Sequence, residues 1–322
     1  MKLLLIRTLI IFLARLGALA YAAPPVPAAP EKTPLRATVE FQPREGLPNF
    51  SVKLVAGHPV KIAYLGGGIT AQARWRMQSL AWFQKRYPQA VITEVNAAIG
   101  CTGSELGVYR VAQDALAAKP DLLFVEFAVN GHAADPTEII RPMERIGPLG
   151  RPRPHALGVP LLADNLEGAK IIPLDPTALA AAGAAALDPA TDQLATKFAR
   201  QVPALWKLAP GTALHLRFTG TRAAIHDLFG PDCGELEVTL DGISRTLKRF
   251  DGYSTYHRLS LRQIGDRLAD KGHEVVIEVL PTVLAKRSII LKTRCADLDT
   301  NPTNYIGTNW YVGALLFVGS HP

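Results

Sequence analysis

Hydrophobic and polar positions follow two different patterns along the chain, and the change falls near its middle. In the first half, three short apolar runs predict buried strands at 60–67, 90–98 and 121–131. The longer segments between them, 70–88 and 103–120, are amphipathic and predict helices. Strands that alternate with helices over short connections predict a parallel α/β sheet with helices on both faces.

From about residue 167 onward, apolar and polar residues alternate with a period of two. One short strand is expected at 167–174, and the Ala-rich stretch at 176–193 is expected to form a helix or a loose loop. Eight alternating segments follow, at 213–220, 223–229, 234–242, 245–251, 256–261, 273–280, 287–293 and 313–319. Short alternating strands separated by turn residues predict a β-sandwich, so the fold class is α/β plus all-β.

The expected domains are an α/β domain at 46–146, a Pro/Gly-rich linker at 147–166 and the β-sandwich at 167–322. The N-terminus predicts a signal peptide over 1–22, because a basic start is followed by an apolar stretch and small residues at cleavage spacing. Residues 23–45 form a Pro/Ala-rich tether. The protein is therefore expected to be exported, to the periplasm or the extracellular space.

Composition limits the classes of partner. Hydrophobic residues make up 48% of the 322 and charged residues 20%, which suits a chain that buries a core. The formal net charge is +7, but the basic residues are dispersed and predict no nucleic-acid surface. Arg7 and Arg15 interrupt the N-terminal apolar stretch, which argues against a stable membrane span.

Neither a metal nor a nucleotide cofactor is predicted. The three cysteines show no spacing typical of a metal site. An exported protein could pair two of them, with Cys233–Cys295 the favoured pair, or keep three free thiols including Cys101. The glycine turn GGGITAQAR at 66–74 fits neither a P-loop nor a dinucleotide fingerprint.

Three loops at the carboxyl ends of the predicted parallel strands are where a ligand is expected. They read GGGIT from 66, NAAIGCTGS from 96 and AVNGH from 128. Ligands of open parallel sheets bind outside the carboxyl ends of the strands. The candidate site of the first half is therefore at these loops.

The order and spacing of the blocks LGGGIT, NAAIGCTGSELGVYR and KPDLLFVEFAVNG resemble the first three blocks of the SGNH (GDSL-like) hydrolases, from about Gly46 to Arg145. The resemblance implies a flavodoxin-like sheet and ester hydrolysis. In that family the first block carries the nucleophilic serine, the second and third supply a glycine amide and an asparagine to the oxyanion hole, and a final DxxH block supplies the Asp and His.

The sequence departs from this family pattern at the positions that carry the chemistry. Gly68 stands at the nucleophile position, and the oxyanion-hole amide falls on Gly100 or, better, on Cys101. Asn130 matches the asparagine of the hole. After Arg145 the resemblance stops, no DxxH occurs downstream, and the sheet is expected to be shortened to about three strands.

These departures predict a catalytically impaired member of a carbohydrate-esterase lineage, which could retain binding of an acylated carbohydrate or small ester. One alternative is an active esterase that uses Cys101 as nucleophile, with His132 as a conceivable base. The other is a structural protein that docks a partner, or a second copy, through the third strand, whose edge and apolar side chains the missing strands would leave open.

The second half resembles, more weakly, the galactose-binding-like jelly rolls that accompany some SGNH esterases. Its aromatic-rich stretches, YSTYHR from 253 and NYIGTNWY from 304, supply the ligand-binding candidates Tyr256, His257, Trp310 and Tyr311. Exposed aromatics with polar neighbours are typical of carbohydrate sites on such folds. The alternative is that some of these aromatics pack in the core, since they carry large buried area.

Overall fold

The computed structural model describes residues 46–131, 136–149, 166 and 168–320, and residues from Leu47 onward cluster into one compact unit. The predicted signal peptide and tether, His132, and most of the predicted linker lie outside the described residues. Within the described ranges, none of the helices has the length and apolar character needed to cross a bilayer.

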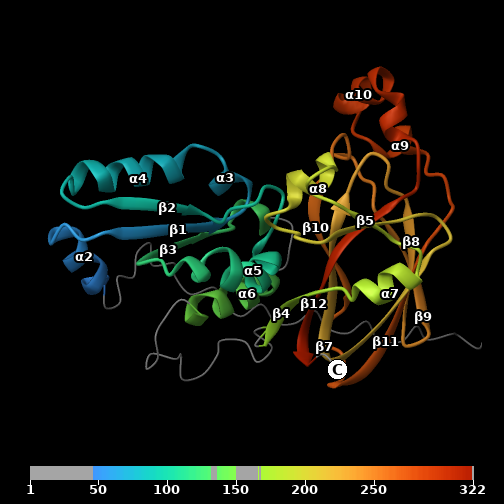
Figure 1. Ribbon diagram of the computed structural model, residues 1–322, viewed down its shortest axis with the longest axis horizontal. Coiled ribbons are helices and arrows are strands. Elements are labelled where there is room, and N and C mark those ends of the chain that lie inside the picture. The colour runs from blue at the N-terminus through green and yellow to red at the C-terminus, as the bar shows by residue number, and fades with distance from the viewer. Residues whose placement is uncertain (1–45, 132–135, 150–165, 167, 321–322) are drawn as a thin grey trace, which may run out of the picture. The chain divides into compact units, whose positions relative to one another are not determined.

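A three-stranded parallel sheet forms the α/β part, in the order β2-β1-β3 (Figure 1). Its strands are β1 (Val60–Gly66), β2 (Ile92–Asn96) and β3 (Leu122–Glu126). The helices around it are α2 (Pro48–Val55), α3 (Gly68–Ala71), α4 (Trp75–Arg86), α5 (Ser104–Asp114) and α6 (Pro136–Leu149). The predicted class, α/β with a shortened parallel sheet, agrees with this arrangement.

Alternate residues of β1 face two separate hydrophobic clusters. Ile62 and Tyr64 point into a cluster with α2 and α4, whereas Ala63 and Leu65 point into a cluster with α5. In Figure 1, α4 lies above the three strands and α5 and α6 lie below them. Helices therefore cover both faces of the sheet, as the apolar runs predicted.

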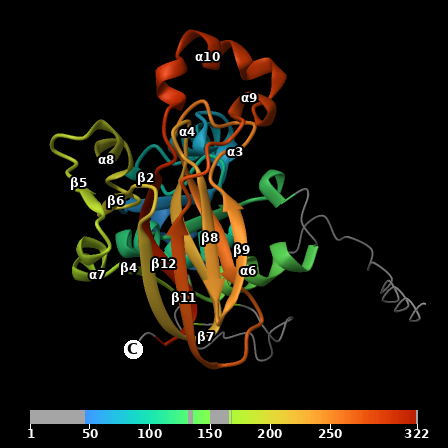
Figure 2. The same ribbon diagram turned by 90° about the vertical axis from the view of Figure 1, so that its right-hand side faces the viewer.

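The β part is one hydrogen-bonded set of nine strands, in the order β5-β6-β12-β7-β11-β8-β9, with β10 paired to β7 and β4 to β12 (Figure 2). Its strands are β4 (Ala169–Pro173), β5 (Ala185–Leu187), β6 (Leu205–Leu208), β7 (Ala213–Phe229), β8 (Glu235–Leu240), β9 (Ile243–Lys248), β10 (Arg258–Gly265), β11 (Lys271–Val279) and β12 (Trp310–Ser320). Its assigned strand pairs are all antiparallel.

Short helices connect these strands. They are α7 (Pro176–Ala181), α8 (Gln193–Phe198), α9 (Lys286–Ile289), α10 (Cys295–Thr300) and the 3₁₀ turns η3 (Lys292–Arg294) and η4 (Pro302–Tyr305). Two further 3₁₀ turns, η1 (Leu116–Ala118) and η2 (Val129–Gly131), lie in the α/β part, before and after β3. Both views show α9 and α10 together at one end of the β strands (Figures 1 and 2).

Several predicted elements differ from those observed. The expected strand at 287–293 is the helix α9 followed by η3, because Ile290 packs with Phe250 and Tyr305 in a small cluster outside the sheet. The two expected strands at 213–220 and 223–229 are one continuous strand, β7. The expected helix at 70–88 is broken into α3 and α4, with Gln72 in an extended conformation between them.

A shared hydrophobic cluster joins the α/β part to the β part. Val108 of α5 and Phe127 belong to the same cluster as Ala224 of β7 and Leu316 of β12. Ion pairs reinforce this contact, since buried Arg222 of β7 pairs with Glu105 of α5. The two parts therefore pack against each other through both apolar and charged groups.

The third strand is better covered than its sequence predicted. Leu123 and Val125 pack in the cluster shared with the β part, and Leu122 and Phe124 pack with the α2–α4 cluster. The apolar side chains of this strand are therefore partly covered within the described part of the chain, in part by the β part. Its backbone edge away from β1 has no strand partner among the described residues. Self-association through that edge remains a prediction.

Candidate functional site

The three consecutive glycines Gly66, Gly67 and Gly68, which begin at the last residue of β1, have different amounts of space around them. A Cβ on Gly66 would lie 2.6 Å from the carbonyl oxygen of Glu126 and would overlap the Thr70 side chain. A Cβ on Gly67 would overlap the side-chain amide of Asn130. Both positions therefore require glycine because neighbouring atoms occupy the place of a side chain.

Gly68 is the exception, because open space lies where its side chain would be. The nearest atoms to an ideal Cβ at this position are the Cys101 amide nitrogen and the Gly100 Cα, each at 3.9 Å. Gly68 is the first residue of α3, and Gly67 precedes it in an extended conformation. A side chain at position 68 would fit and would start close to the Cys101 amide.

The loop after β2 is anchored on both sides. The Ile99 amide donates to the Gly66 carbonyl at 3.0 Å, and the Arg110 guanidinium donates to the Gly66 and Ala97 carbonyls. The Ile99 side chain belongs to a cluster with Leu228 of the β part. The loop that carries Gly100 and Cys101 is thereby fixed between the two parts.

Cys101 adopts a left-handed backbone conformation with φ of 63°. Glycine takes this conformation without steric cost, whereas a residue with a side chain is strained there. Its thiol is exposed, and its Sγ lies 3.8 Å from the Tyr256 hydroxyl of the β part. Tyr256 has its pKa raised by burial and by the Cys101 side chain.

Glu126 holds the first and third loops together. Its carboxylate accepts a hydrogen bond from the Thr70 hydroxyl at 2.8 Å and one from the Ala128 amide at 2.9 Å. Thr70 belongs to α3, so this hydrogen bond ties the start of that helix to the end of β3. The contact places the turn that carries Asn130 beside Gly67.

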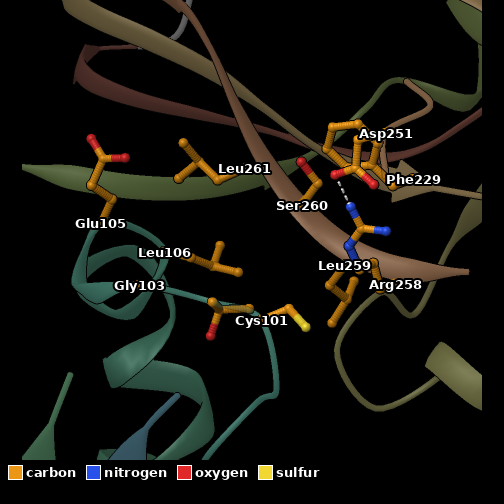
Figure 3. A pocket seen from close by; sticks show the side chains of 11 residues that line it. Cys101, Gly103, Glu105, Leu106, Phe229, Asp251, Arg258, Leu259, Ser260 and Leu261 are labelled. Carbon is orange, nitrogen blue, oxygen red and sulfur yellow. Dashed lines mark hydrogen bonds and ion pairs between the residues drawn. The ribbon is translucent and has the colours of Figure 1, made fainter. Parts of the chain in front are cut away.

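The Cys101 side chain lines a cavity of about 280 Å³ between the α5 start and strand β10 (Figure 3). The lining residues are Cys101, Thr102, Gly103, Glu105, Leu106, Phe229, Asp251, Arg258, Leu259, Ser260 and Leu261. Arg258 is ion-paired with Asp251, and its guanidinium lies 4.7 Å from the centroid of the Phe229 ring. The cavity is therefore polar, and the positive charge of Arg258 is balanced by the Asp251 carboxylate.

A hydrogen-bonded network lies on the other side of Tyr256. Asp232 accepts from the Nε2 of His257 at 2.7 Å, from the Tyr311 hydroxyl at 2.6 Å and from Asn309 Nδ2 at 2.9 Å. Burial raises the pKa of Asp232, but the three donors outweigh it and lower the pKa to about 2. Since an ionised carboxylate only accepts, the His257 proton is on Nε2.

The four aromatic and imidazole candidates of the second half have different environments. Tyr256 and His257 line a second cavity. Tyr311 is buried beneath the His257 ring and bonded to Asp232. Trp310 is 0% exposed and its indole donates to the buried Asp227, so the expectation of an exposed, ligand-contacting aromatic at Trp310 is wrong.

Asp232, Cys233 and His257 form a group that could offer one ligand atom each to a metal ion, with these atoms within 4.8 Å of one another. Two observations argue against that use. The His257 Nε2 is hydrogen-bonded to Asp232, and the Lys286 ammonium, which acts electrostatically on both Asp232 and Cys233, already supplies a positive charge. We therefore interpret Asp232 and His257 as a hydrogen-bonded pair, beside which the Cys233 thiol contacts the Leu228 carbonyl.

The three cysteines are free thiols, so the favoured Cys233–Cys295 pairing is wrong. Cys233 is fully buried in a cluster with Leu228 and Tyr311, and burial raises the pKa of its thiol well above the usual range. Cys295 is partly buried and its thiol contacts the Leu291 carbonyl.

The structure brings together Gly68, Gly100, Cys101 and Asn130, as their block order suggested. It also places Tyr256 next to this group, through the contact of its hydroxyl with Cys101. Sequence reasoning missed Asp232, although the turn-forming GPDCG around it marks a rigid loop between two strands.

Comparisons with known proteins found likeness at the level of the fold. No protein-family model matches the chain, and no curated protein matches it. The crystal structure of a two-domain esterase (CEX) active on acetylated mannans, co-crystallized with mannopentaose, is 15% identical with a TM-score of 0.57. The match covers 86% of this chain and 95% of that chain. A second structure of that esterase matches with the same identity and TM-score over 85% and 95% of the two chains.

A family two carbohydrate esterase from Cellvibrio japonicus is 11% identical over 48% of this chain, with a TM-score of 0.28, which is too low to support an argument. The likeness to the two-domain esterase shows that the α/β sheet followed by an antiparallel β part is an arrangement shared over most of both chains.

Proposed function

We propose that this chain is an exported, catalytically impaired protein of the SGNH (GDSL-like) carbohydrate-esterase lineage that binds an acylated carbohydrate without cleaving it. The fold likeness to an esterase active on acetylated mannans supports the lineage and the ligand class. The observation that carries the proposal is the open space at Gly68, beside the Cys101 amide, with the Asn130 side chain against the neighbouring Gly67.

These groups suit the recognition of an ester carbonyl. A backbone N–H at Cys101 and an amide side chain at Asn130 are donors of the kind that stabilise an oxyanion. The left-handed conformation of Cys101 favours position 101 over Gly100 as the counterpart of the family's glycine. Donors that lie around a residue without a nucleophile would hold a carbonyl oxygen but could not attack the carbon.

The test compares binding with turnover. Acetylated mannan should bind more tightly than the same mannan after chemical deacetylation, and Asn130→Ala should remove that difference. Asn49→Ala, on the exposed surface of α2, is the matched control. No hydrolysis of p-nitrophenyl acetate or release of acetate above buffer is expected. Acetate release by the wild-type protein would refute the proposal of impaired catalysis.

Cys101 as an alternative nucleophile is favoured by one observation, its exposed thiol in the cavity of Figure 3. Its hydrogen-bonding partner among the described residues is the Tyr256 hydroxyl, whose raised pKa keeps it protonated at neutral pH, so that it is not available to take the thiol proton. Turnover that disappears in Cys101→Ala and persists in Cys295→Ala would establish this alternative.

A further inference from the structure

We propose that the cavity beside Tyr256 and His257 is a subsite for a neutral sugar ring, built entirely by the β part. The inference rests on the proposed function and names where the carbohydrate would be held. The cavity has a volume of about 520 Å³, within the range of small-molecule sites. It is lined by Gln193, Leu194, Lys197, Pro231, Asp232, Thr255, Tyr256, His257, Thr303, Asn304 and Ile306.

Two large apolar side chains are exposed at this cavity. Tyr256 is 42% exposed and Ile306 is 72% exposed. Exposed apolar groups that border a cavity mark ligand-binding surfaces more often than isolated ones do. A tyrosine supplies a rigid flat face with a polar tip, which suits the apolar C–H face of a pyranose and its hydroxyl rim.

Hydrogen-bonding groups surround this apolar surface. The exposed side chains of Gln193 and Asn304 make no hydrogen bond within the described part of the chain, so each can donate and accept. A neutral His257 ring that donates from Nε2 to Asp232 presents its Nδ1 as an acceptor. Amide and imidazole groups of this kind match the hydroxyls of a sugar.

The charged groups at the cavity already have partners within the β part, which suits a neutral ligand. Asp232 accepts three hydrogen bonds from its neighbours. The Lys197 ammonium donates to the His257 carbonyl at 3.1 Å and lies 5.6 Å from the centroid of the Tyr256 ring. Among the described lining residues, neither charged side chain is therefore unpaired.

A buried lysine fixes two walls of the cavity. The Lys286 ammonium donates to the carbonyls of Pro231, Tyr305 and Gly307 at 2.7, 2.8 and 2.9 Å. Pro231 lines the cavity directly, and Tyr305 lies between the lining residues Asn304 and Ile306. The site is thus held in place before a ligand arrives, which lowers the ordering cost of binding.

The subsite is next to the loops around Gly68. Tyr256 lines the cavity, and its hydroxyl lies 3.8 Å from the Cys101 Sγ, on the loop whose amide faces Gly68. One oligosaccharide could therefore place a sugar ring at Tyr256 and an acyl group at Cys101 and Asn130.

The experiment measures binding of unacetylated mannopentaose to the full chain by calorimetry. Binding of polygalacturonate, an acidic polysaccharide, is measured in the same way for comparison. Tyr256→Ala should weaken mannopentaose binding about tenfold or more, and Gln193→Ala by severalfold. The matched control is Tyr253→Ala, which removes a tyrosine that is also exposed but does not line the cavity. Thermal unfolding of each variant verifies that the fold is kept.

Three outcomes would overturn the subsite: no binding of mannopentaose by the wild-type chain, equal losses in Tyr256→Ala and Tyr253→Ala, or binding of polygalacturonate in preference to mannopentaose. The same measurements distinguish failure of the proposed function from failure of the subsite. If acetylation and Asn130→Ala have no effect while Tyr256→Ala abolishes binding, the subsite stands and ester recognition does not. If only Asn130→Ala matters, ester recognition stands and the subsite does not.

Discussion

The amide nitrogen of Cys101 lies 3.9 Å from the point at which a side chain on Gly68 would begin. A serine at that position would start beside a backbone donor of the kind used in oxyanion holes. The neighbouring glycines Gly66 and Gly67 lack such space. Of the three glycines in this turn, Gly68, at the position where the related hydrolases carry their serine, is thus the one that has room for a side chain.

The first prediction concerns stability at this turn. Gly68→Ser should change the free energy of unfolding by less than about 1 kcal/mol, because no atom lies closer than 3.9 Å to the added carbon. Gly67→Ser should cost about 2 kcal/mol or more, because its side chain would overlap Asn130. Urea unfolding of the two variants measures the difference, and equal costs would contradict the close approach of Asn130 to Gly67.

The second prediction concerns activity. Gly68→Ser should not hydrolyse p-nitrophenyl acetate above the wild-type rate, because a serine hydroxyl needs an adjacent base and no DxxH block follows Arg145. The control is Gly68→Ala, which adds the carbon without the hydroxyl. A rate in Gly68→Ser well above that of Gly68→Ala would mean that this chain supplies a base by another route.

The third prediction is a loss of stability in mild acid that originates at His226. Its ring is buried, neither ring nitrogen has a hydrogen-bond partner among the described residues, and burial, helped by the nearby Arg110 charge, lowers its pKa to about 4. A histidine whose folded pKa lies below its unfolded value of about 6.5 contributes its full stability above pH 6.5 and loses it as the pH falls toward 4.

Between pH 7.5 and pH 5 the expected loss from His226 is about 2 kcal/mol in the free energy of unfolding. His226→Leu should flatten this slope, whereas His215→Leu, at an exposed position of β7, should leave it unchanged. The carboxylate of Asp232 titrates lower, with a folded pKa of about 2, so its contribution is lost only below about pH 4. An unchanged slope in His226→Leu would exclude this origin.

The fourth prediction concerns the contact between the α/β part and the β part. Arg222, 2% exposed, pairs with Glu105 and Asp266, so Arg222→Met should cost about 3–5 kcal/mol by leaving two partly buried carboxylates without this partner. Arg217→Met on the same strand removes an ion pair with Glu274 in which the side chains are 77% and 70% exposed. That variant should cost less than about 1 kcal/mol. Chemical unfolding of both variants measures the two costs, and similar values would contradict a contribution from burial.

Local patterns predicted the parallel sheet well, because each strand of the α/β part is a short apolar run between turn residues. They failed at 287–293, where Ile289 and Ile290 are apolar neighbours in a loop cluster rather than alternate residues of a strand. The spacing of apolar residues alone cannot distinguish a strand from a short helix at this length, since a few apolar residues can be buried in either structure.

The candidate site was predictable where backbone placement determines it. Gly68, Cys101 and Asn130 follow three strands whose carboxyl ends share one edge, so their meeting follows from the topology. Trp310 was misassigned because sequence gives an aromatic residue but not its exposure, and here its indole reaches the buried Asp227. Asp232 could not be found from local sequence, because its partners lie 25, 77 and 79 residues away.

The long strand β7 has a consequence for how the protein is made. It pairs with β12, which leaves the ribosome long after the three parallel strands have been synthesised. Until β12 arrives, Val108 and Phe127 lack part of the apolar surface that later covers them. A nascent chain with its α/β part complete would therefore expose apolar side chains for many seconds, which makes it a natural client of a holding chaperone during translation.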